Sequence, residues 1–271
     1  MHPNSEKVTK RDNRFQRLQV IITNREKRGR YGEFLVEGFN SLKRIIEFNW
    51  TIRFWVYSSE RGLSTFAADL IDSRPEVPAL DLTPELLAEL SEKELASEIM
   101  AVVEIPDDST NRIRKGTNPL YVVFDRPQNP GNLGTNIRTC DAFGVDTAFV
   151  IGHSVDVFDP ETVRASVGSL FAIPVLRRPA WVDVLDDLKA TFNGNIQVVG
   201  TTANGTTLIQ QCDFTKPTVL LIGNEKTGLS KALVEAADPL ITIPQSGSAT
   251  SLNVSCATSI LLYEVQRQRA N

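Results

Sequence analysis

The sequence has few of the residues that bind metals or form disulfide bonds. Its 271 residues include three cysteines and two histidines, and these provide neither the C-x-x-C nor the H-x-x-x-H pair that a structural zinc site would need. The cysteines are odd in number and lie far apart, at Cys140, Cys212 and Cys256. We therefore expect free thiols, no metal and a cytoplasmic location.

Long apolar runs and a secretory signal are also absent. The run "VLLIG" at residues 219–223 is far too short to cross a bilayer. The N-terminus, "MHPNSEKVTKRDNRFQRLQ", is charged and lacks the apolar core of a signal peptide. We therefore expect no membrane partner, and the 41% apolar and 23% charged residues are ordinary for a soluble protein.

Charge is distributed unevenly along the chain. The net charge is −4, but residues 1–30 carry nine Lys/Arg against three acidic residues, which makes this segment +6 and the remainder −10. A basic head on an acidic body predicts contact with a polyanion, with a solvated helix face as the alternative. The basic residues that we expect to contact phosphates are Arg25, Lys27, Arg28 and Arg30.

The N-terminal part of the chain shows alternating helix-like and strand-like patterns. Residues 13–28 place Phe15, Leu18 and Ile22 at helical spacing with basic residues between them, which predicts an amphipathic helix. Strand and helix patterns then alternate as far as "IMAVVEIP". These patterns predict a small α/β domain that begins with a basic helix.

The length exceeds the usual single-domain size and predicts two domains. We assign residues 1–106 to the basic extension and the small α/β domain. Residues 107–118 are polar and lack apolar periodicity, so we expect a linker there. Residues 119–271 then alternate short apolar strands with helices, which predicts a parallel sheet covered on both faces.

Three polar, glycine-bearing stretches of this second domain each follow an apolar strand and precede a helix: "DRPQNPGNLGTNIR", "GNEKTGLS" and "PQSGSATSLN". In a parallel sheet such turns lie at the same edge, beyond the carboxyl ends of the strands, where ligands bind. Any one of them alone is more typical of an ordinary capped turn than of a binding site. Three together predict a binding site.

The sequence does not match the common nucleotide-binding and hydrolase motifs. "GNEKTGLS" has the spacing of a phosphate-binding loop, but Leu229 stands where that loop has its lysine. "GNLGTN" is too short for a dinucleotide fingerprint. The chain has no G-x-S-x-G elbow, and His153 is the one histidine of the second domain, so a Ser-His-acid hydrolase is disfavoured.

The motifs "NPGNLGTNIRTCDAFGV", "LLIGNEKTGLS" and "IPQSGSATSLNVSCAT" resemble the three ordered motifs of the SpoU/TrmH branch of the SPOUT RNA methyltransferases. The segment "NREKRGRYGEFLVEGFNSLKRIIE" is similar to the L30e-like domain of rRNA-modifying members. The resemblance implies an α/β fold with a trefoil-knotted catalytic domain, S-adenosylmethionine as methyl donor, a homodimer, and 2′-O-methylation of a ribose in 23S rRNA. Antibiotic resistance is a role of some such members and one expectation here.

The resemblance also assigns site residues. A guanidinium is a poor proton acceptor at neutral pH, so we expect Arg138 to hold a phosphate and the developing 2′-oxyanion. Taken singly, Arg138 could be a surface ion-pairing residue and Asn253 a helix cap. The expected catalytic set is Arg138, Asn132, Glu225, Ser251 and Asn253, and the expected cofactor-binding set is Gly223, Ile243, Leu252, Thr201 and Asn224.

Two alternatives stay open. The first is a tRNA ribose 2′-O-methyltransferase, against which the L30e-like domain argues. The second is a non-catalytic RNA-binding module, and the presence of all the expected polar catalytic residues argues against it. Donor binding separates the second alternative from an enzyme.

Arg138 provides the first prediction. Arg138→Ala should leave the fold and S-adenosylmethionine binding intact but reduce methyl transfer at least ~100-fold, the usual scale for loss of an electrostatic donor at a reacting oxygen. Single-turnover rates, with donor affinity from calorimetry, measure this. Unchanged turnover would remove Arg138 from the site.

Overall fold

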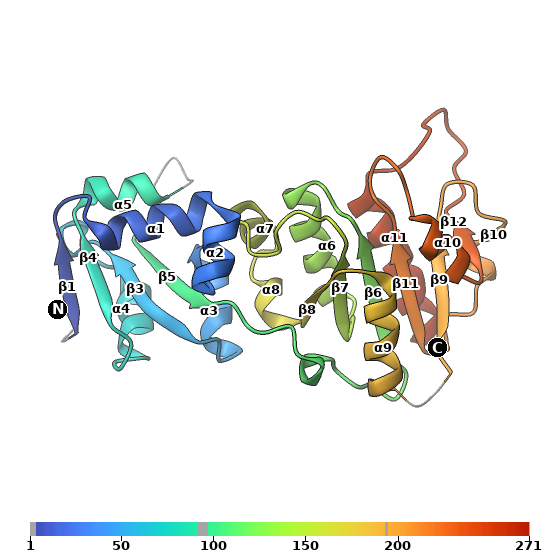
Figure 1. Cartoon of the computed structure of the whole chain (residues 1–271), viewed down its shortest axis with the longest axis horizontal. Coiled ribbons are helices and arrows are strands. Elements are labelled where there is room, and N and C mark those ends of the chain that lie inside the picture. Colours follow the sequence, from blue (N-terminus) through green and yellow to red (C-terminus); the bar gives the residue numbers. More distant parts are fainter. Residues whose placement is uncertain (1–3, 92–96, 193–194, 271) are drawn as a thin grey trace. The chain divides into compact units, whose positions relative to one another are not determined.

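The computed structural model describes residues 4–91, 97–192 and 195–270 (Figure 1). The chain divides into two compact units. Unit 1 comprises Met1–Asp107 and Phe158–Phe171, and unit 2 comprises Asp108–Val157 and Ala172–Asn271. The first division lies beside the linker expected from the sequence, whereas the segment 158–171 belongs to unit 1 although it lies deep in the second expected domain.

Unit 1 contains a mixed sheet. Its strands are β1 (Ser5–Val8), β2 (Glu33–Glu37), β3 (Ile52–Tyr57), β4 (Ala79–Leu82) and β5 (Ile99–Glu104). They lie in the order β1-β4-β3-β5-β2. Strands β1, β4 and β3 are parallel to one another, and β5 is antiparallel to both of its neighbours, β3 and β2. The sequence patterns missed β1 and β4, which are short.

Helices cover the sheet of unit 1 with apolar side chains. They are α1 (Asn13–Thr23), α2 (Arg25–Tyr31), α3 (Phe39–Glu47), α4 (Thr65–Asp72), α5 (Pro84–Leu90), α7 (Pro160–Ala165) and α8 (Ser169–Ala172), of which α8 ends one residue beyond the unit. Phe15, Leu18 and Ile21 of α1 and Leu87 of α5 share one core cluster with strand residues such as Val56. The helix pattern predicted around residues 84–97 extends into residues 92–96, which lie outside the described part.

The single helix predicted over residues 13–28 is in fact two helices. Asn24 ends α1, and its side-chain oxygen accepts the Lys27 N–H at 2.9 Å, so the same residue caps α2. Asparagine is a favoured N-cap because its side chain competes with the helix for backbone donors. The break at Asn24 lets α2 begin in a new direction, and Ile21 rather than Ile22 is fully buried.

Arg28 corrects the predicted RNA-binding set. Its side chain is 2% exposed, and its guanidinium donates to the carbonyl oxygens of Ile21 and Ile22 and lies 3.5 Å from the Asp159 carboxylate. A guanidinium enclosed by protein cannot reach an RNA phosphate. Arg28 therefore serves packing, whereas Arg25 and Arg30 are exposed and Lys27 is half-buried.

The segment 158–171 is bound into unit 1 by aromatic contacts. The Phe34 ring lies 4.9 Å from that of Phe158 and 6.2 Å from that of Phe171, and Trp50 Nε1 donates to the Phe171 carbonyl oxygen at 3.0 Å. Gly168 lies between the two short helices α7 and α8 of this segment, and its φ is +94°. A Cβ there would lie 2.8 Å from Arg44 Cγ, so glycine is required for the close approach to α3.

Unit 2 contains a seven-stranded parallel sheet. Its strands are β6 (Leu120–Asp125), β7 (Thr147–Ile151), β8 (Val175–Arg178), β9 (Gln197–Thr201), β10 (Thr207–Leu208), β11 (Thr218–Ile222) and β12 (Leu240–Thr242). They lie in the order β10-β12-β9-β11-β6-β7-β8, and every pairing is parallel. The predicted α/β class with a mostly parallel sheet is thereby confirmed.

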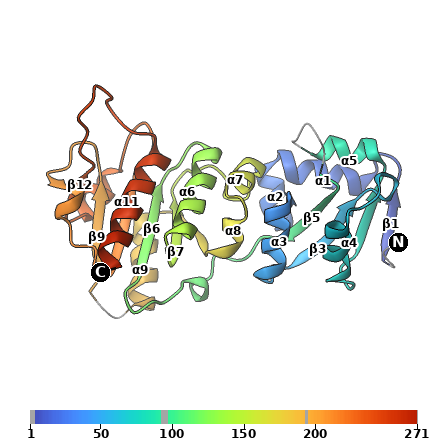
Figure 2. The ribbon, with the colours of Figure 1, turned by 180° about the vertical axis from the view of Figure 1, so that it is seen from behind.

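Helices cover both faces of this sheet, as the continuous apolar strands predict. They are α6 (Pro130–Ala142), α9 (Trp181–Thr191), α10 (Lys231–Ala236) and α11 (Val254–Arg269). Figure 2 shows α6 and α11 side by side on one face, with α9 on the other. Trp181, Val184 and Leu233 of α9 and α10 pack on Tyr121 and Val219.

The expected linker packs on unit 2. Ile113 is buried, the Arg114 N–H donates to Thr147 Oγ1 at 3.1 Å, and Asp108 accepts from Arg177. Polar composition predicted a loop but gave no sign of these anchors. In the part of the chain that the structure describes, each helix is too short or too polar to span a bilayer.

Burial of Arg28 provides a stability prediction. Arg28→Ala should lower the free energy of unfolding by about 2 to 3 kcal/mol, because it leaves buried carbonyl oxygens and a carboxylate without their donor. Urea denaturation measures the change. Arg30→Ala is the matched control: Arg30 is exposed in the same helix, and its loss should cost less than about 0.5 kcal/mol. Equal effects of the two changes would contradict the packing role.

Candidate functional site

Unit 2 has a cavity of about 610 Å³ at the carboxyl ends of β9, β11 and β12. Parallel strands place the loops that follow them at one edge of the sheet, which is where the sequence predicted a site. Apolar side chains alternate with amides and hydroxyls in its wall. The lining residues are Asn132, Thr201, Thr202, Ala203, Asn204, Ile222, Gly223, Asn224, Glu225, Lys226, Gly228, Ile241, Thr242, Ile243, Gln245, Ser251, Leu252, Asn253, Val254, Ala257 and Leu261.

The loop after β11 is a tight turn organised by Asn224. Its Oδ1 accepts from the N–H groups of Lys226 and Thr227, and its Nδ2 donates to the Arg126 carbonyl oxygen at 2.7 Å. Gly223 approaches the returning chain so closely that a Cβ would lie 2.5 Å from the Gly228 carbonyl carbon. The "GN" and "TG" of this motif are therefore needed for the turn itself.

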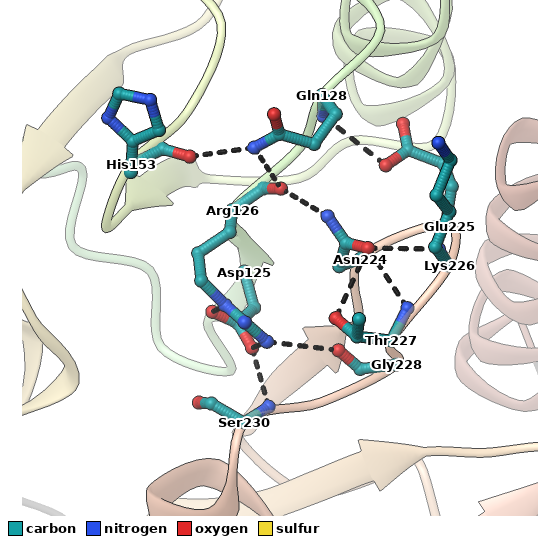
Figure 3. A network of polar contacts seen from close by, with 10 residues as sticks. All are labelled: Asp125, Arg126, Gln128, His153, Asn224, Glu225, Lys226, Thr227, Gly228 and Ser230. Atoms are coloured by element: carbon teal, nitrogen blue, oxygen red, sulfur yellow. Dashed lines mark hydrogen bonds and ion pairs between the residues drawn. The ribbon is translucent and has the colours of Figure 1, made fainter.

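A polar network joins this turn to the loop after β6 (Figure 3). The Asp125 carboxylate accepts from the Arg126 guanidinium at 2.9 and 3.0 Å and from the Ser230 N–H at 2.7 Å. The same guanidinium reaches the Gly228 carbonyl oxygen at 3.3 Å. Arg126 adopts φ of +50°, a left-handed conformation that non-glycine residues rarely take.

The expected catalytic side chains form a connected polar chain at the cavity. Glu225 Oε2 accepts the Gln128 N–H at 3.2 Å, and Glu225 Oε1 accepts from Asn132 Nδ2 at 3.4 Å. Asn132 Oδ1 in turn accepts from Asn253 Nδ2 at 3.3 Å. One residue from each of the three motifs is thus held to the next, so the orientation of Glu225 depends on all three loops.

The third motif combines an exposed loop with a helix start. Asn253 caps α11, and its Oδ1 accepts the N–H of Ser255 at 2.8 Å and that of Cys256 at 3.4 Å. Ser251 and Leu252, just before the cap, are exposed and line the cavity. The polar turn stands before a core helix because the helix anchors one end of a cavity-lining loop.

The structure gathers all of the expected cofactor-binding residues in the cavity wall. They are Gly223, Ile243, Leu252, Thr201 and Asn224. Thr201 Oγ1 donates to the Leu221 carbonyl oxygen at 2.8 Å, so it also ties β9 to β11. Of the expected catalytic residues, Asn132, Glu225, Ser251 and Asn253 line the same cavity.

Arg138 is the exception. It lies on α6, exposed, and makes no hydrogen bond or ion pair with any described residue. It does not line the cavity. At 3.6 residues per turn, six residues place it about two thirds of a turn around the helix from Asn132. Arg138 therefore faces away from the residues of α6 that line the cavity.

Sequence reasoning missed Arg126 and Gln128. Gln128 Nε2 donates to the carbonyl oxygens of Arg126 and His153, at 3.2 and 2.8 Å. Both residues lie in the first of the three polar stretches that predicted a binding site. Their roles were missed because no sequence pattern predicts a positive φ for arginine. The apolar wall residues Ile222, Ile241 and Leu261 were missed because they have the same pattern as ordinary core residues.

Two free thiols belong to the first and third motifs. Burial raises the pKa of the Cys140 thiol far above its usual range, so Cys140 stays protonated at neutral pH. Cys256, near the start of α11, is exposed. Among residues 4–91, 97–192 and 195–270, no three His, Cys, Asp or Glu side chains are grouped to hold a metal ion.

The chain is thus an α/β protein of two units, with a glycine-rich cavity at the edge of a parallel sheet. Residues 119–263 match the SpoU rRNA methylase family, and residues 12–101 match the SpoU L30e-like domain. The chain belongs to the SpoU rRNA methylase family. The resemblance that the three motifs predicted is confirmed.

Individual relatives match over nearly the whole chain. A 23S rRNA (uridine(2479)-2′-O)-methyltransferase of Streptomyces viridochromogenes is 43% identical over 98% of this chain and 94% of its own length. The crystal structure of the SpoU methyltransferase AviRb from Streptomyces viridochromogenes in complex with AdoMet has a TM-score of 0.91 and 43% identity, covering 96% of this chain and 99% of that one. An AdoMet-bound rRNA methyltransferase from Sinorhizobium meliloti has a TM-score of 0.85 and 31% identity, with 97% and 98% covered.

Leu252 tests the cavity as the donor site. Leu252→Asp would place a carboxylate against the apolar wall and should weaken S-adenosylmethionine binding at least ~10-fold, because a charge is costly to bury without a partner. Calorimetric titration measures the dissociation constant. Leu252→Met, which keeps size and polarity, is the control and should bind almost as the unchanged chain does. Equal affinity of both variants would place the donor elsewhere.

Proposed function

We propose that this chain methylates a ribose 2′-hydroxyl of 23S rRNA, with S-adenosylmethionine as the methyl donor. One observation carries the proposal: the loops that form the cavity lie within residues 119–263, which match the SpoU rRNA methylase family, and a relative that is 43% identical over 98% of this chain is named as a 23S rRNA 2′-O-methyltransferase. A relative named as the guanosine-2553 2′-O-methyltransferase of Bacillus subtilis 23S rRNA, 30% identical over 89% of this chain, supports the same substrate class.

The residues present fit S-adenosylmethionine. Ile243, Leu252 and Leu261 give the cavity apolar side chains that suit the faces of an adenine ring. Gly223 exposes backbone N–H and C=O groups to the cavity without a side chain in the way. The volume of about 610 Å³ lies within the usual range for small-molecule sites. When bound, the donor supplies a methyl group on a sulfonium sulfur for attack by a hydroxyl oxygen.

Glu225 is the acidic side chain among the described residues that line the cavity. Each of its oxygens accepts one hydrogen bond, from Gln128 and from Asn132, and an ionised carboxylate has further lone pairs. It can therefore accept the hydrogen bond of a ribose 2′-hydroxyl and take its proton as the new oxygen–carbon bond forms. Asn132, itself held by Asn253, helps to orient Glu225 toward the cavity.

We propose a homodimer formed through α6 and α11. Cys256, Ile260 and Tyr263 are exposed at helical spacing along one stripe of α11, and the Tyr263 side chain is 60% exposed. An apolar stripe of this kind marks an interaction surface, and a two-fold axis lets the same patch cover itself. Arg138 projects from the neighbouring helix α6, so dimerisation would carry it toward the second protomer, where it would complete that protomer's site.

The trefoil knot is likewise a proposal, supported by how the chain runs. In the sheet, β9 and β11 lie between β12 and β6. The helix that follows β12, α11, nevertheless packs beside α6, the helix that follows β6. The chain must therefore cross back over the sheet edge between residues 243 and 253. The cavity-lining loop is this crossing, as the family resemblance implies.

We favour rRNA over tRNA because about a hundred residues form a separate L30e-like unit with exposed basic side chains. After the exclusion of Arg28, the proposed phosphate contacts are Arg25, Lys27 and Arg30. A cytoplasmic location follows from such a substrate. Antibiotic resistance stays a prediction of the sequence resemblance, and growth with and without the gene in the presence of ribosome-targeting antibiotics tests it.

Labelled donor tests the substrate. The protein should transfer label to a 23S rRNA transcript, but not to a tRNA pool or to a 23S transcript with a 2′-deoxy substitution at the mapped target, because the accepting oxygen is then missing. Scintillation counting and mass mapping of nuclease fragments measure the transfer. The Leu252→Asp variant serves as the donor-binding control, and at limiting donor concentration its labelling of the 23S transcript should fall in proportion to its weaker donor affinity.

Each deviation has a defined meaning. Efficient labelling of the tRNA pool would favour the tRNA alternative. Labelling of the deoxy transcript would mean that a base receives the methyl group. Donor binding without labelling of any RNA, in the presence of assembled or partly assembled subunits as well, would favour the non-catalytic alternative.

A further inference from the structure

Unit 1 exposes three large aromatic side chains, and they differ in what covers their rings. Tyr31 has the Arg17 guanidinium over its face at 5.2 Å, and Phe48 has that of Arg44 at 5.7 Å. Phe39 is the most exposed of the three, at 57%, and no cation of the described residues lies over it. Its surface is thus apolar, flat and open on one side.

The other side of the Phe39 ring rests on Phe66. The two centroids are 4.2 Å apart with an interplanar angle of 34°. Phe39 begins α3, which is anchored by the buried Leu42 and Ile45, and Phe66 is half-buried near the start of α4. Two rings from two anchored helices form a rigid platform, so a flat ligand that stacks on it would lose little additional freedom of the protein.

A cationic group beside the platform is free to bind. Lys43 lies four residues after Phe39, and therefore on the same side of α3, and is exposed. Its side chain bonds to no residue that the structure describes. A flat apolar face next to an unpaired ammonium matches two parts of a nucleotide: the face of its base and its phosphate.

We propose that Phe39, backed by Phe66, is a stacking site for an unpaired base of the RNA substrate, with Lys43 on an adjacent phosphate. The inference rests on the proposed function and deepens it, because it requires that the recognised rRNA segment present at least one splayed base. Stacking on an aromatic ring accepts any base, so this site contributes affinity and shape selection rather than sequence selection.

The test compares Phe39→Leu with Phe39→Trp. Leucine keeps an apolar side chain but loses the flat ring, and RNA affinity should fall about 10-fold, the scale of one base stacked on an aromatic ring. Tryptophan keeps a flat ring and should restore affinity to within about threefold. Filter binding of the labelled 23S transcript measures the dissociation constant, and steady-state methylation gives KM and kcat.

A surface stacking site predicts a selective effect. In Phe39→Leu the KM for RNA should rise in parallel with the dissociation constant, while kcat at saturating RNA and the affinity for S-adenosylmethionine stay unchanged. Phe48→Leu is the matched control: Phe48 is an exposed aromatic residue just after the same helix, but its ring is already covered by Arg44. It should bind RNA within about twofold of the unchanged chain.

Several results would overturn the proposal. RNA affinity of Phe39→Leu equal to that of the unchanged chain would remove the site. Loss of affinity in Phe39→Trp as well would mean that the ring does not stack a base. A change of oligomeric state in Phe39→Leu, measured by sedimentation, would assign the patch to a protein interface instead. Binding is measured without methyl transfer, so failure of the proposed enzyme activity leaves this comparison readable.

Discussion

The buried carboxylate of Asp125 is the group on which the arrangement of the site depends. It is 2% exposed at the end of β6, and a charge in that position is tolerated only when it is fully paired. Its partners are the Arg126 guanidinium and the Ser230 N–H, and Arg126 also holds the Gly228 carbonyl oxygen. Pairing this one charge therefore fixes the loop after β11 against the loop after β6, and the position of Glu225 follows.

The strained backbone of Arg126 has a physical reason in this arrangement. Its N–H donates to the Ile151 carbonyl oxygen, its own carbonyl oxygen accepts from Asn224 and Gln128, and its side chain turns back to Asp125. With its left-handed φ, this one residue hydrogen-bonds to the neighbouring strand and to both loops at once. The cost of that conformation, about 1 to 3 kcal/mol, is offset by the bonds it permits.

The spacing of apolar residues and the polar, glycine-bearing turns of the sequence were enough to predict the parallel sheet and the edge where its loops meet. The three polar turns predicted only that a site lies at this edge, and the individual residues of the cavity wall were assigned by the resemblance of the three motifs to the family. What could not be predicted depends on tertiary contact. Arg28 has the pattern of a surface cation but is buried, and Gly168 is required by the approach of Arg44 from another helix. The break at Asn24 is local, since its side chain caps α2, but the apolar periodicity that runs through it predicted one helix.

The same limit explains Arg138. Sequence motifs place it near Asn132, but six residues put the two side chains about two thirds of a turn apart around α6, and of the two it is Asn132 that lines the cavity. α6 thus presents Asn132 to the cavity and Arg138 to the outside. A helix with two functional sides next to an uncovered apolar surface is most simply explained if the surface is covered by a second copy. Catalysis and assembly would then depend on the same pair of helices, so loss of the dimer would also remove Arg138 from the site that it completes.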